Sequence, residues 1–179
     1  MNESDIKKVL LTKEQLDEIV KRLGEQISND YKDKKLMLVG VLKGSVLFMA
    51  DLMRSITIDC KIDFMAVSSY AGGTKSTGAV KIIKDLDIDL SGYDLLIVED
   101  ILDSGNTLSY LKKMLLARNP SSIRICTLLD KPSRRVADVT ADYVGAVIPD
   151  EFVVGYGLDY DEYYRNLSFV GVLKESVYE

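Results

Sequence analysis

Residues 95–108 read LLIVEDILDSGNTL. The apolar run at the start of this stretch predicts a buried strand, which should end at the adjacent carboxylates Glu99 and Asp100. A third carboxylate, Asp103, and a small polar loop then lead into a helix expected over residues 107–118. Because ligands of open α/β sheets bind at the carboxyl ends of the strands, this junction is the first candidate for a functional site.

The polar loop has the composition of a phosphate-binding turn. It consists of Ser104, Gly105, Asn106 and Thr107, and it leads into the predicted helix. Such a loop offers backbone N–H groups, hydroxyls and the positive end of the helix dipole to an anion. Neither the Walker pattern nor the complete glycine pattern of dinucleotide-binding turns occurs in the chain. The loop therefore predicts a phosphate site of another kind.

Three carboxylates beside such a loop would repel a bare phosphate, but they suit a ribose phosphate. Carboxylates accept hydrogen bonds from ribose hydroxyls, hold Mg²⁺ and stabilise the positive charge that develops on an anomeric carbon. On spacing alone one alternative stays open. An acidic strand end followed by a serine-capped helix is also a common solvated feature of soluble proteins.

The remainder of the chain predicts an α/β fold. Thr12 and Gln15 form the pattern of a capping box that opens a first helix. Apolar runs predict a second helix over 44–56 and strands over 36–42, 62–70, 80–84, 94–98 and 123–129. Strands that alternate with helices indicate a central, mostly parallel twisted sheet flanked by helices.

The C-terminal part has a different character, with short aromatic and glycine-rich pieces. We expect an edge strand there, together with a small hood or flap. The expected organisation is a single domain over residues 1–179, with a core at about 8–135. The hood should run from about 136 to 179 and include the N-terminal segment.

Composition excludes several functional classes. The chain has 179 residues, a formal charge of −5 and no histidine, and its pI is about 4.9. The lack of histidine excludes Ser-His-Asp triads and histidine-based zinc sites, so acid–base chemistry must use other side chains. The acidic balance argues against a nucleic-acid partner. We also expect no membrane partner, because no apolar run approaches the length of a membrane span.

The two cysteines, Cys60 and Cys126, are far apart in the sequence and match neither a disulfide framework nor a zinc spacing. They are best interpreted as small core residues in a reducing compartment. The N-terminus is polar and has no secretory apolar region. We therefore expect a cytoplasmic protein.

The segment VEDILDSGNT, residues 98–107, resembles the phosphoribosyl-pyrophosphate signature of type I phosphoribosyltransferases. Four further segments follow the order found in the hypoxanthine-guanine members of that family: VLKGS at 41–45, SSY at 68–70, LLDKP at 128–132 and PDEFVVGYGLDY at 149–160. The resemblance covers nearly the entire chain. It implies the type I phosphoribosyltransferase fold with a small C-terminal hood.

The resemblance implies transfer of the 5-phosphoribosyl group from 5-phospho-α-D-ribose 1-diphosphate (PRPP) to hypoxanthine or guanine. The products would be IMP or GMP and pyrophosphate, a reaction of purine salvage that depends on Mg²⁺. The small-molecule partners are thus PRPP, a 6-oxopurine, a nucleoside monophosphate and pyrophosphate. A homodimer or homotetramer is also implied.

For the donor, the resemblance implies roles for residues in four groups. The ribose and 5-phosphate would be bound by Glu99, Asp100, Asp103, Ser104, Gly105, Asn106 and Thr107. The pyrophosphate would be bound by Lys43, Gly44 and Arg165, with Arg135 as a weaker candidate. The metal ligands would be Glu99, Asp100 and Asp159, and the lid would begin at Ser69 and Tyr70. The family also carries a cis peptide before the lysine at position 43.

For the base, the resemblance implies that Asp103 is the catalytic acid–base group facing N7 of the purine. The purine would be bound by Lys131, Phe152, Val153 and Asp159. Lys131 would donate to O6, which disfavours adenine because an amino group there is itself a donor. Judged without the resemblance, Lys43 and Lys131 are solvated lysines, Phe152 is a core aromatic and Arg165 is a partner in a surface ion pair.

Three alternative functions stay open. The same chemistry could have xanthine as the preferred base. A non-catalytic regulator that senses the donor would need a basic patch or an added nucleic-acid domain, which the pI and length do not offer. A plain ligand carrier would release no pyrophosphate when donor and hypoxanthine are mixed.

Overall fold

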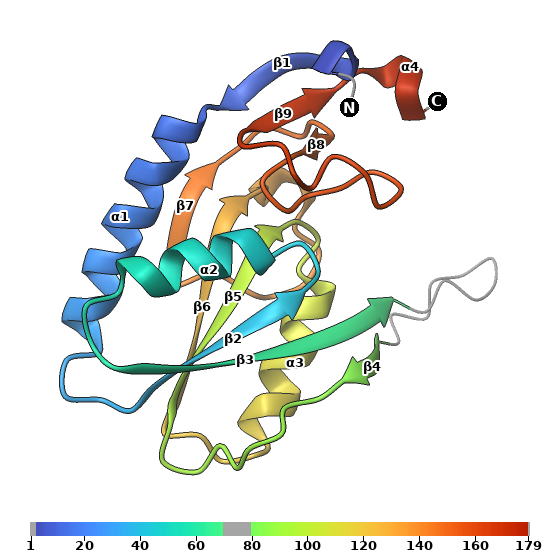
Figure 1. Cartoon of the computed structure of the whole chain (residues 1–179). Coiled ribbons are helices and arrows are strands. Elements are labelled where there is room, and N and C mark those ends of the chain that lie inside the picture. Colours follow the sequence, from blue (N-terminus) through green and yellow to red (C-terminus); the bar gives the residue numbers. More distant parts are fainter. Residues whose placement is uncertain (1–2, 70–79, 179) are drawn as a thin grey trace.

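The computed structural model describes residues 3–69 and 80–178, and its centre is a six-stranded sheet (Figure 1). The strand order is β4-β3-β2-β5-β6-β7. All neighbouring strands are parallel except β4, which runs antiparallel to β3 at one edge. The strands are β2 (Leu36–Leu42), β3 (Cys60–Ser69), β4 (Val80–Lys84), β5 (Asp94–Leu102), β6 (Ser122–Asp130) and β7 (Tyr143–Val147). The predicted mostly parallel sheet is confirmed.

Helices cover both faces of this sheet. Helices α1 (Lys13–Asp30) and α2 (Val46–Ser55) pack on one face, and α3 (Asn106–Leu116) packs on the other. Within β5, Leu96 and Val98 contact the core under α1 and α2, whereas Leu95 and Ile97 contact the core under α3. Both sides of the strand are therefore buried, which explains its continuous apolar sequence.

The first helix begins where its sequence predicts. The Thr12 hydroxyl accepts a hydrogen bond from the Gln15 backbone N–H at 3.3 Å, and the Gln15 side chain accepts one from the Thr12 N–H at 2.9 Å. This reciprocal pair satisfies two backbone donors that the first helical turn leaves without partners.

A second, three-stranded sheet forms the hood, in the order β1-β9-β8. Its strands are β1 (Ile6–Leu11), β8 (Val153–Val154) and β9 (Val170–Leu173), flanked by the 3₁₀ helix η1 (Glu3–Asp5) and the short helix α4 (Glu175–Tyr178). The two ends of the chain thus lie side by side above the main sheet (Figure 1). The N-terminal strand β1 is thus part of this second sheet.

Two boundaries differ from the sequence-based expectation. Strand β5 does not end at Glu99 but continues to Leu102, because Glu99 and Ile101 still pair with β6. Strand β7 falls in the range expected for the hood but belongs to the main sheet, where it pairs in parallel with β6. It is an edge strand there, and an edge strand was expected in this part of the chain. Its sequence, YVGAV, is short and apolar, and nothing in it indicates which of the two sheets the strand joins.

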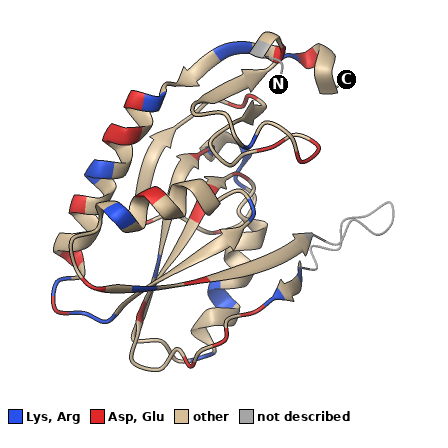
Figure 2. Cartoon of the chain, in the orientation of Figure 1, with Lys and Arg blue, Asp and Glu red and all other residues tan. Residues whose placement is uncertain are grey.

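Charges are mixed over the surface. Basic and acidic residues are interspersed along α1, and acidic residues mark the end of β5 and the hood loop (Figure 2). Over residues 3–69 and 80–178, no helix is long and apolar enough to cross a membrane.

Candidate active site

The loop between β5 and α3 forms one end of the site. Gly105, the residue before α3, has a φ of +82°, a left-handed conformation that glycine adopts without strain. A Cβ at this position would lie 2.5 Å from Val139 Cγ1, so the packing also requires glycine. As a glycine, the N-cap residue Gly105 has no side chain that could cap the helix. The first N–H groups of α3 are therefore available to an anion, as the sequence predicts.

Arg135 braces this loop from behind. Its guanidinium donates to the backbone oxygens of Asp103 at 2.9 Å and Val139 at 2.7 Å, and it pairs with the Asp130 carboxylate. The backbone N–H of Val136 also donates to the Ser104 carbonyl at 2.9 Å. Arg135 was named as a weaker pyrophosphate candidate. Its guanidinium instead holds the backbone of the phosphate loop in place.

Glu99 and Asp100 are held at the last third of β5 in an environment that disfavours negative charge. Burial is the main cause that raises the pKa of Asp100 to about 6, and burial together with the Asp100 charge raises the pKa of Glu99 well above its ordinary value. The Glu99 Oε2 atom is inaccessible to solvent and has no hydrogen-bond partner among the described residues. Such carboxylates are poised to accept a cation or a hydroxyl donor.

The Lys43 loop packs directly against this acidic pair. A Cβ on Gly44 would lie 1.6 Å from Asp100 Oδ2, so only glycine allows the loop backbone to approach the carboxylate. The Leu42-Lys43 peptide is cis, as the resemblance implies. A Cβ on Gly157 in the hood would lie 2.0 Å from the Gly44 carbonyl oxygen. Core and hood therefore meet at this point.

The two cations predicted to bind pyrophosphate face the same acidic hood loop. Lys43 Nζ lies 2.8 Å from Glu162 Oε2, and Arg165 Nη2 lies 3.4 Å from Glu162 Oε1. Arg165 also pairs with Asp159 at 2.9 Å and donates to the Gly157 carbonyl at 2.8 Å. Glu162 was not among the predicted site residues, because an acidic residue in an acidic loop carries no signal of its own.

The predicted metal ligands are not gathered into one cage. Among the described residues, no group of three or more carboxylate, cysteine or histidine side chains is arranged to hold a metal ion. Asp159 is paired with Arg165, while Glu99 and Asp100 lie on β5. This arrangement fits Mg²⁺, which is usually held by one or two carboxylates together with substrate phosphates and water.

A cavity of about 420 Å³ lies between the end of the main sheet and the hood. It brings together most of the residues predicted to act on the purine, although they are distant in the sequence. Its lining includes Asp103, Lys131, Phe152 and Val153, together with Ile101, Arg134, Asp150, Glu151, Leu158 and Tyr178. Asp159, which was also assigned to the purine, is absent from this lining.

The polar groups of this cavity form a chain of opposite charges. Lys131 is only 7% exposed, and its Nζ lies 3.9 Å from Asp150. Arg134 Nε lies 3.5 Å from Asp103 Oδ1, and its Nη1 lies 3.6 Å from Asp150. Asp103 Oδ1 makes no hydrogen bond within the described residues. Arg134, which sequence reasoning missed, is therefore the cation beside the predicted acid–base group.

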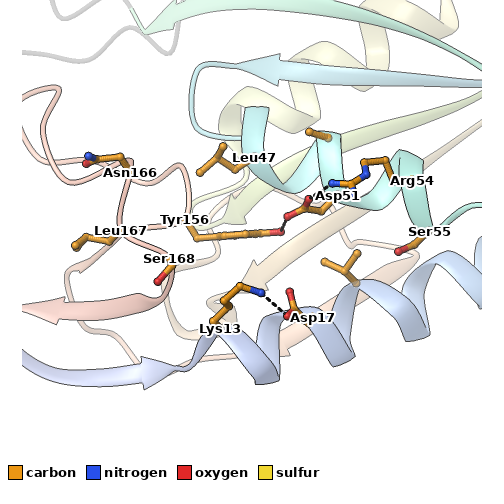
Figure 3. Close-up of a pocket in the computed structure, with 12 residues that line it drawn as sticks. Lys13, Asp17, Leu47, Asp51, Arg54, Ser55, Tyr156, Asn166, Leu167 and Ser168 are labelled. Atoms are coloured by element: carbon orange, nitrogen blue, oxygen red, sulfur yellow. Dashed lines mark hydrogen bonds and ion pairs between the residues drawn. The ribbon is translucent and has the colours of Figure 1, made fainter.

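A larger cavity of about 670 Å³ lies between α1, α2 and the hood (Figure 3). Here the Tyr156 hydroxyl donates to Asp51 on α2 at 2.6 Å. Tyr156 belongs to the same FVVGYG run as Phe152, but it points to α2 and fastens the hood to the core. The hydrogen bond to Asp51 gives Tyr156 a structural role, so no contact with a ligand is needed to account for this residue of the motif.

Only the first residue of the predicted lid lies among the described residues. Ser69 is the last residue of β3, and Tyr70 lies outside the described residues. The lid therefore stays a prediction of the resemblance.

Comparison with known proteins agrees with this geometry. A family model described as "Phosphoribosyl transferase domain" matches residues 9–161. The matched range covers most of the chain, so the protein is a phosphoribosyl transferase by family and fold.

Individual relatives narrow the class. The hypoxanthine-guanine phosphoribosyltransferase of Staphylococcus epidermidis is 56% identical over 174 residues, which cover 97% of each chain. The crystal structure of a hypoxanthine phosphoribosyltransferase from Staphylococcus aureus is 56% identical, with a TM-score of 0.95 and coverage of 98% of this chain and 96% of the other. The enzyme of Trypanosoma cruzi gives 40% identity and a TM-score of 0.94, covering 99% and 96%. The chain belongs to the hypoxanthine-guanine phosphoribosyltransferase family.

Proposed function

We propose that this chain transfers the 5-phosphoribosyl group of PRPP to hypoxanthine or guanine, giving IMP or GMP and pyrophosphate. One observation carries the proposal. The loop with free helical N–H groups and the cavity lined by Lys131 and Phe152 meet at Asp103, which belongs to both. A sugar held at the loop would therefore present its anomeric carbon to a base held in the cavity.

At the donor end, the amides and hydroxyls of residues 104–107 would bind the 5-phosphate. Glu99 and Asp100 would accept hydrogen bonds from the ribose hydroxyls. Lys43, the Gly44 backbone and Arg165 would bind the pyrophosphate, and they would stabilise the negative charge it gains as the C1–O bond breaks. Lys43 and Arg165 must then exchange Glu162 for the pyrophosphate.

At the base end, Phe152 would stack on the purine and the Val153 backbone would contact its edge. Lys131 would donate to O6, and a buried lysine without such an acceptor would keep only the 3.9 Å contact to Asp150. Adenine offers an amino donor at that position, so the site would reject it. Asp103 would accept or return the N7 proton as N9 attacks the anomeric carbon.

Mg²⁺ would be held by Asp159 and by Glu99 and Asp100, together with the diphosphate and water. When bound, it would neutralise charge on the diphosphate and so assist its departure. The Glu99 Oε2 atom supports this assignment, because it is a solvent-inaccessible acceptor without a hydrogen-bond partner among the described residues. The lid that begins at Ser69 and Tyr70 would close over the centre and exclude water, which competes with the base.

We also propose a homodimer or homotetramer in the cytoplasm. Helix α2 exposes Val46, Leu47 and Met53 to solvent at 37–39%, an apolar surface that a second copy would cover. The two cysteines are unpaired, which fits a reducing compartment. Light scattering in solution tests the assembly.

The function is tested by mixing the protein with PRPP, Mg²⁺ and one base at a time, and measuring pyrophosphate release. Hypoxanthine and guanine should support turnover, and adenine should not. If xanthine were turned over faster than hypoxanthine and guanine, the reaction would stand but the preferred base would be xanthine. No release with any oxopurine would contradict the enzyme assignment and favour a donor-sensing regulator or a ligand carrier.

A further inference from the structure

Three aromatic rings from three different segments meet beside the base cavity. Phe152 and Tyr178 are stacked, with ring centroids 4.9 Å apart and an interplanar angle of 26°. Tyr160 meets both rings edge-on, at 5.7 Å from Phe152 and 6.4 Å from Tyr178. Phe152 and Tyr178 both line the cavity that contains Asp103 and Lys131.

The spacing of the stacked rings decides where a purine can lie. Stacked aromatic rings need about 3.5 Å between their planes, the optimal distance for carbon atoms in contact. A base between Phe152 and Tyr178 would therefore need about twice that separation, and the observed 4.9 Å between centroids leaves no room for it. The base must therefore use the face of Phe152 opposite Tyr178; the Phe152 residue as a whole is 39% exposed.

The position of Tyr178 is fixed by the hood. The Lys174 backbone N–H donates to the Asp5 carbonyl at 2.9 Å, and Glu175 pairs with Lys7 at 3.7 Å. Val177 packs against the small apolar core of the hood. Short as it is, α4 is thus attached to the N-terminal segment, and this attachment holds the Tyr178 ring against Phe152.

We propose that Tyr178 is a positioning residue for the base: its ring backs Phe152 and fixes the plane on which the purine stacks. The inference rests on the proposed function, since it assumes that Phe152 binds the base. Truncation of Tyr178 would free Phe152 to turn about its side-chain bonds. The stacking face would then be lost part of the time, and binding of the base would weaken. Binding of the donor would change little, because the 104–107 loop, Lys43 and Arg165 do not line the cavity beside Tyr178.

The test is steady-state kinetics of Tyr178→Ala, Tyr178→Leu and Tyr178→Phe with hypoxanthine and PRPP varied in turn. Tyr178→Ala should raise KM for hypoxanthine by about three- to tenfold, in line with the worth of one aromatic pair, and should leave KM for PRPP within about twofold. Tyr178→Phe keeps the ring and should restore the wild-type KM. Tyr178→Leu keeps apolar bulk without a flat face and should fall between the two.

Tyr163→Ala is the matched control. Tyr163 is a hood tyrosine that is 71% exposed and is not part of the three-ring group, so its removal should leave KM for hypoxanthine unchanged. A wild-type KM in Tyr178→Ala, a lower KM, or an equal rise for both substrates would overturn the positioning role. Wild-type protein without hypoxanthine-dependent turnover would instead overturn the proposed function itself, and the inference with it.

Discussion

The two ends of the proposed site are built in different ways. The part of the donor end that would bind the ribose 5-phosphate is made by one continuous segment, in which β5, a glycine in a left-handed conformation and the start of α3 follow one another within residues 94–107. The base end takes side chains from four separate places: Asp103, Lys131, Phe152 and Tyr178. The 5-phosphate loop would bind largely through backbone groups, whereas the base end would bind through side chains. Substitutions should therefore affect the base end more strongly than the donor loop.

The largest effect is expected at the residue that both ends share. Asp103→Asn keeps the shape of the side chain but cannot take a proton, so kcat should fall by about 100- to 1,000-fold while binding of PRPP stays within about threefold. Turnover under saturating substrates and calorimetric binding of PRPP with Mg²⁺ measure the two quantities. Unchanged turnover would show that Asp103 does not take part in the reaction. The two ends of the site would then share no residue.

The next effect isolates the base end. Lys131→Met keeps the length of the buried side chain and removes its only donor, so kcat/KM for hypoxanthine should fall by about 10- to 100-fold. KM for PRPP should change little, because Lys131 lies outside the donor loop. Lys113→Met, an exposed lysine of α3, is the control and should behave as wild type. An equal loss for both substrates would mean that Lys131 supports the fold and does not read the base.

The two ends of the site also differ in how much of them could be predicted from the sequence. The strand, the loop and the helix of the donor end could be predicted from apolar runs, a glycine and small polar residues, because their structure is local. The roles of Lys131 and Phe152 needed the resemblance, since a buried lysine and a stacked aromatic look like surface and core residues until the chain is folded. The partners of Lys43 and Asp103, namely Glu162 and Arg134, come from tertiary packing that no local pattern records.

A smaller effect is expected where the donor end meets the hood. Glu162 pairs with Lys43 and Arg165, and Arg165 also pairs with Asp159. Glu162→Gln should therefore free Lys43, remove one of the two carboxylates from Arg165, and lower the Kd for pyrophosphate by about two- to fivefold, the worth of an exposed ion pair. Asp161→Asn removes the same charge from the same loop, where Asp161 forms no ion pair among the described residues, and it is the matched control. Equal shifts in both variants would show a general charge effect and not displacement of one carboxylate.

The smallest effect concerns stability and pH in the metal-free protein. The pKa of Asp100 is raised to about 6, so the folded state holds its proton more tightly than the unfolded chain, and stability is lost as pH rises from about 4 to about 6. Asp100→Asn avoids this loss. Its Tm relative to wild type should therefore be higher at pH 7.5 than at pH 4.5 by about 2–4 °C, which corresponds to roughly 1 kcal/mol. Thermal unfolding in EDTA measures the difference.

Glu25→Gln, at an exposed position of α1, serves as the control for that experiment and should show the same Tm difference from wild type at both pH values. If Asp100→Asn also shows no dependence on pH, the acidic end of β5 is not a destabilised site that awaits a ligand.

The most direct measurement is a crystal structure of the protein with IMP or GMP bound. The 5-phosphate should lie on the amides of residues 104–107, and the ribose should lie beside Glu99 and Asp100. The base should stack on the face of Phe152 opposite Tyr178, with O6 toward Lys131. A nucleotide whose sugar lies away from residues 99–107, or whose base lies outside this cavity, would contradict the account.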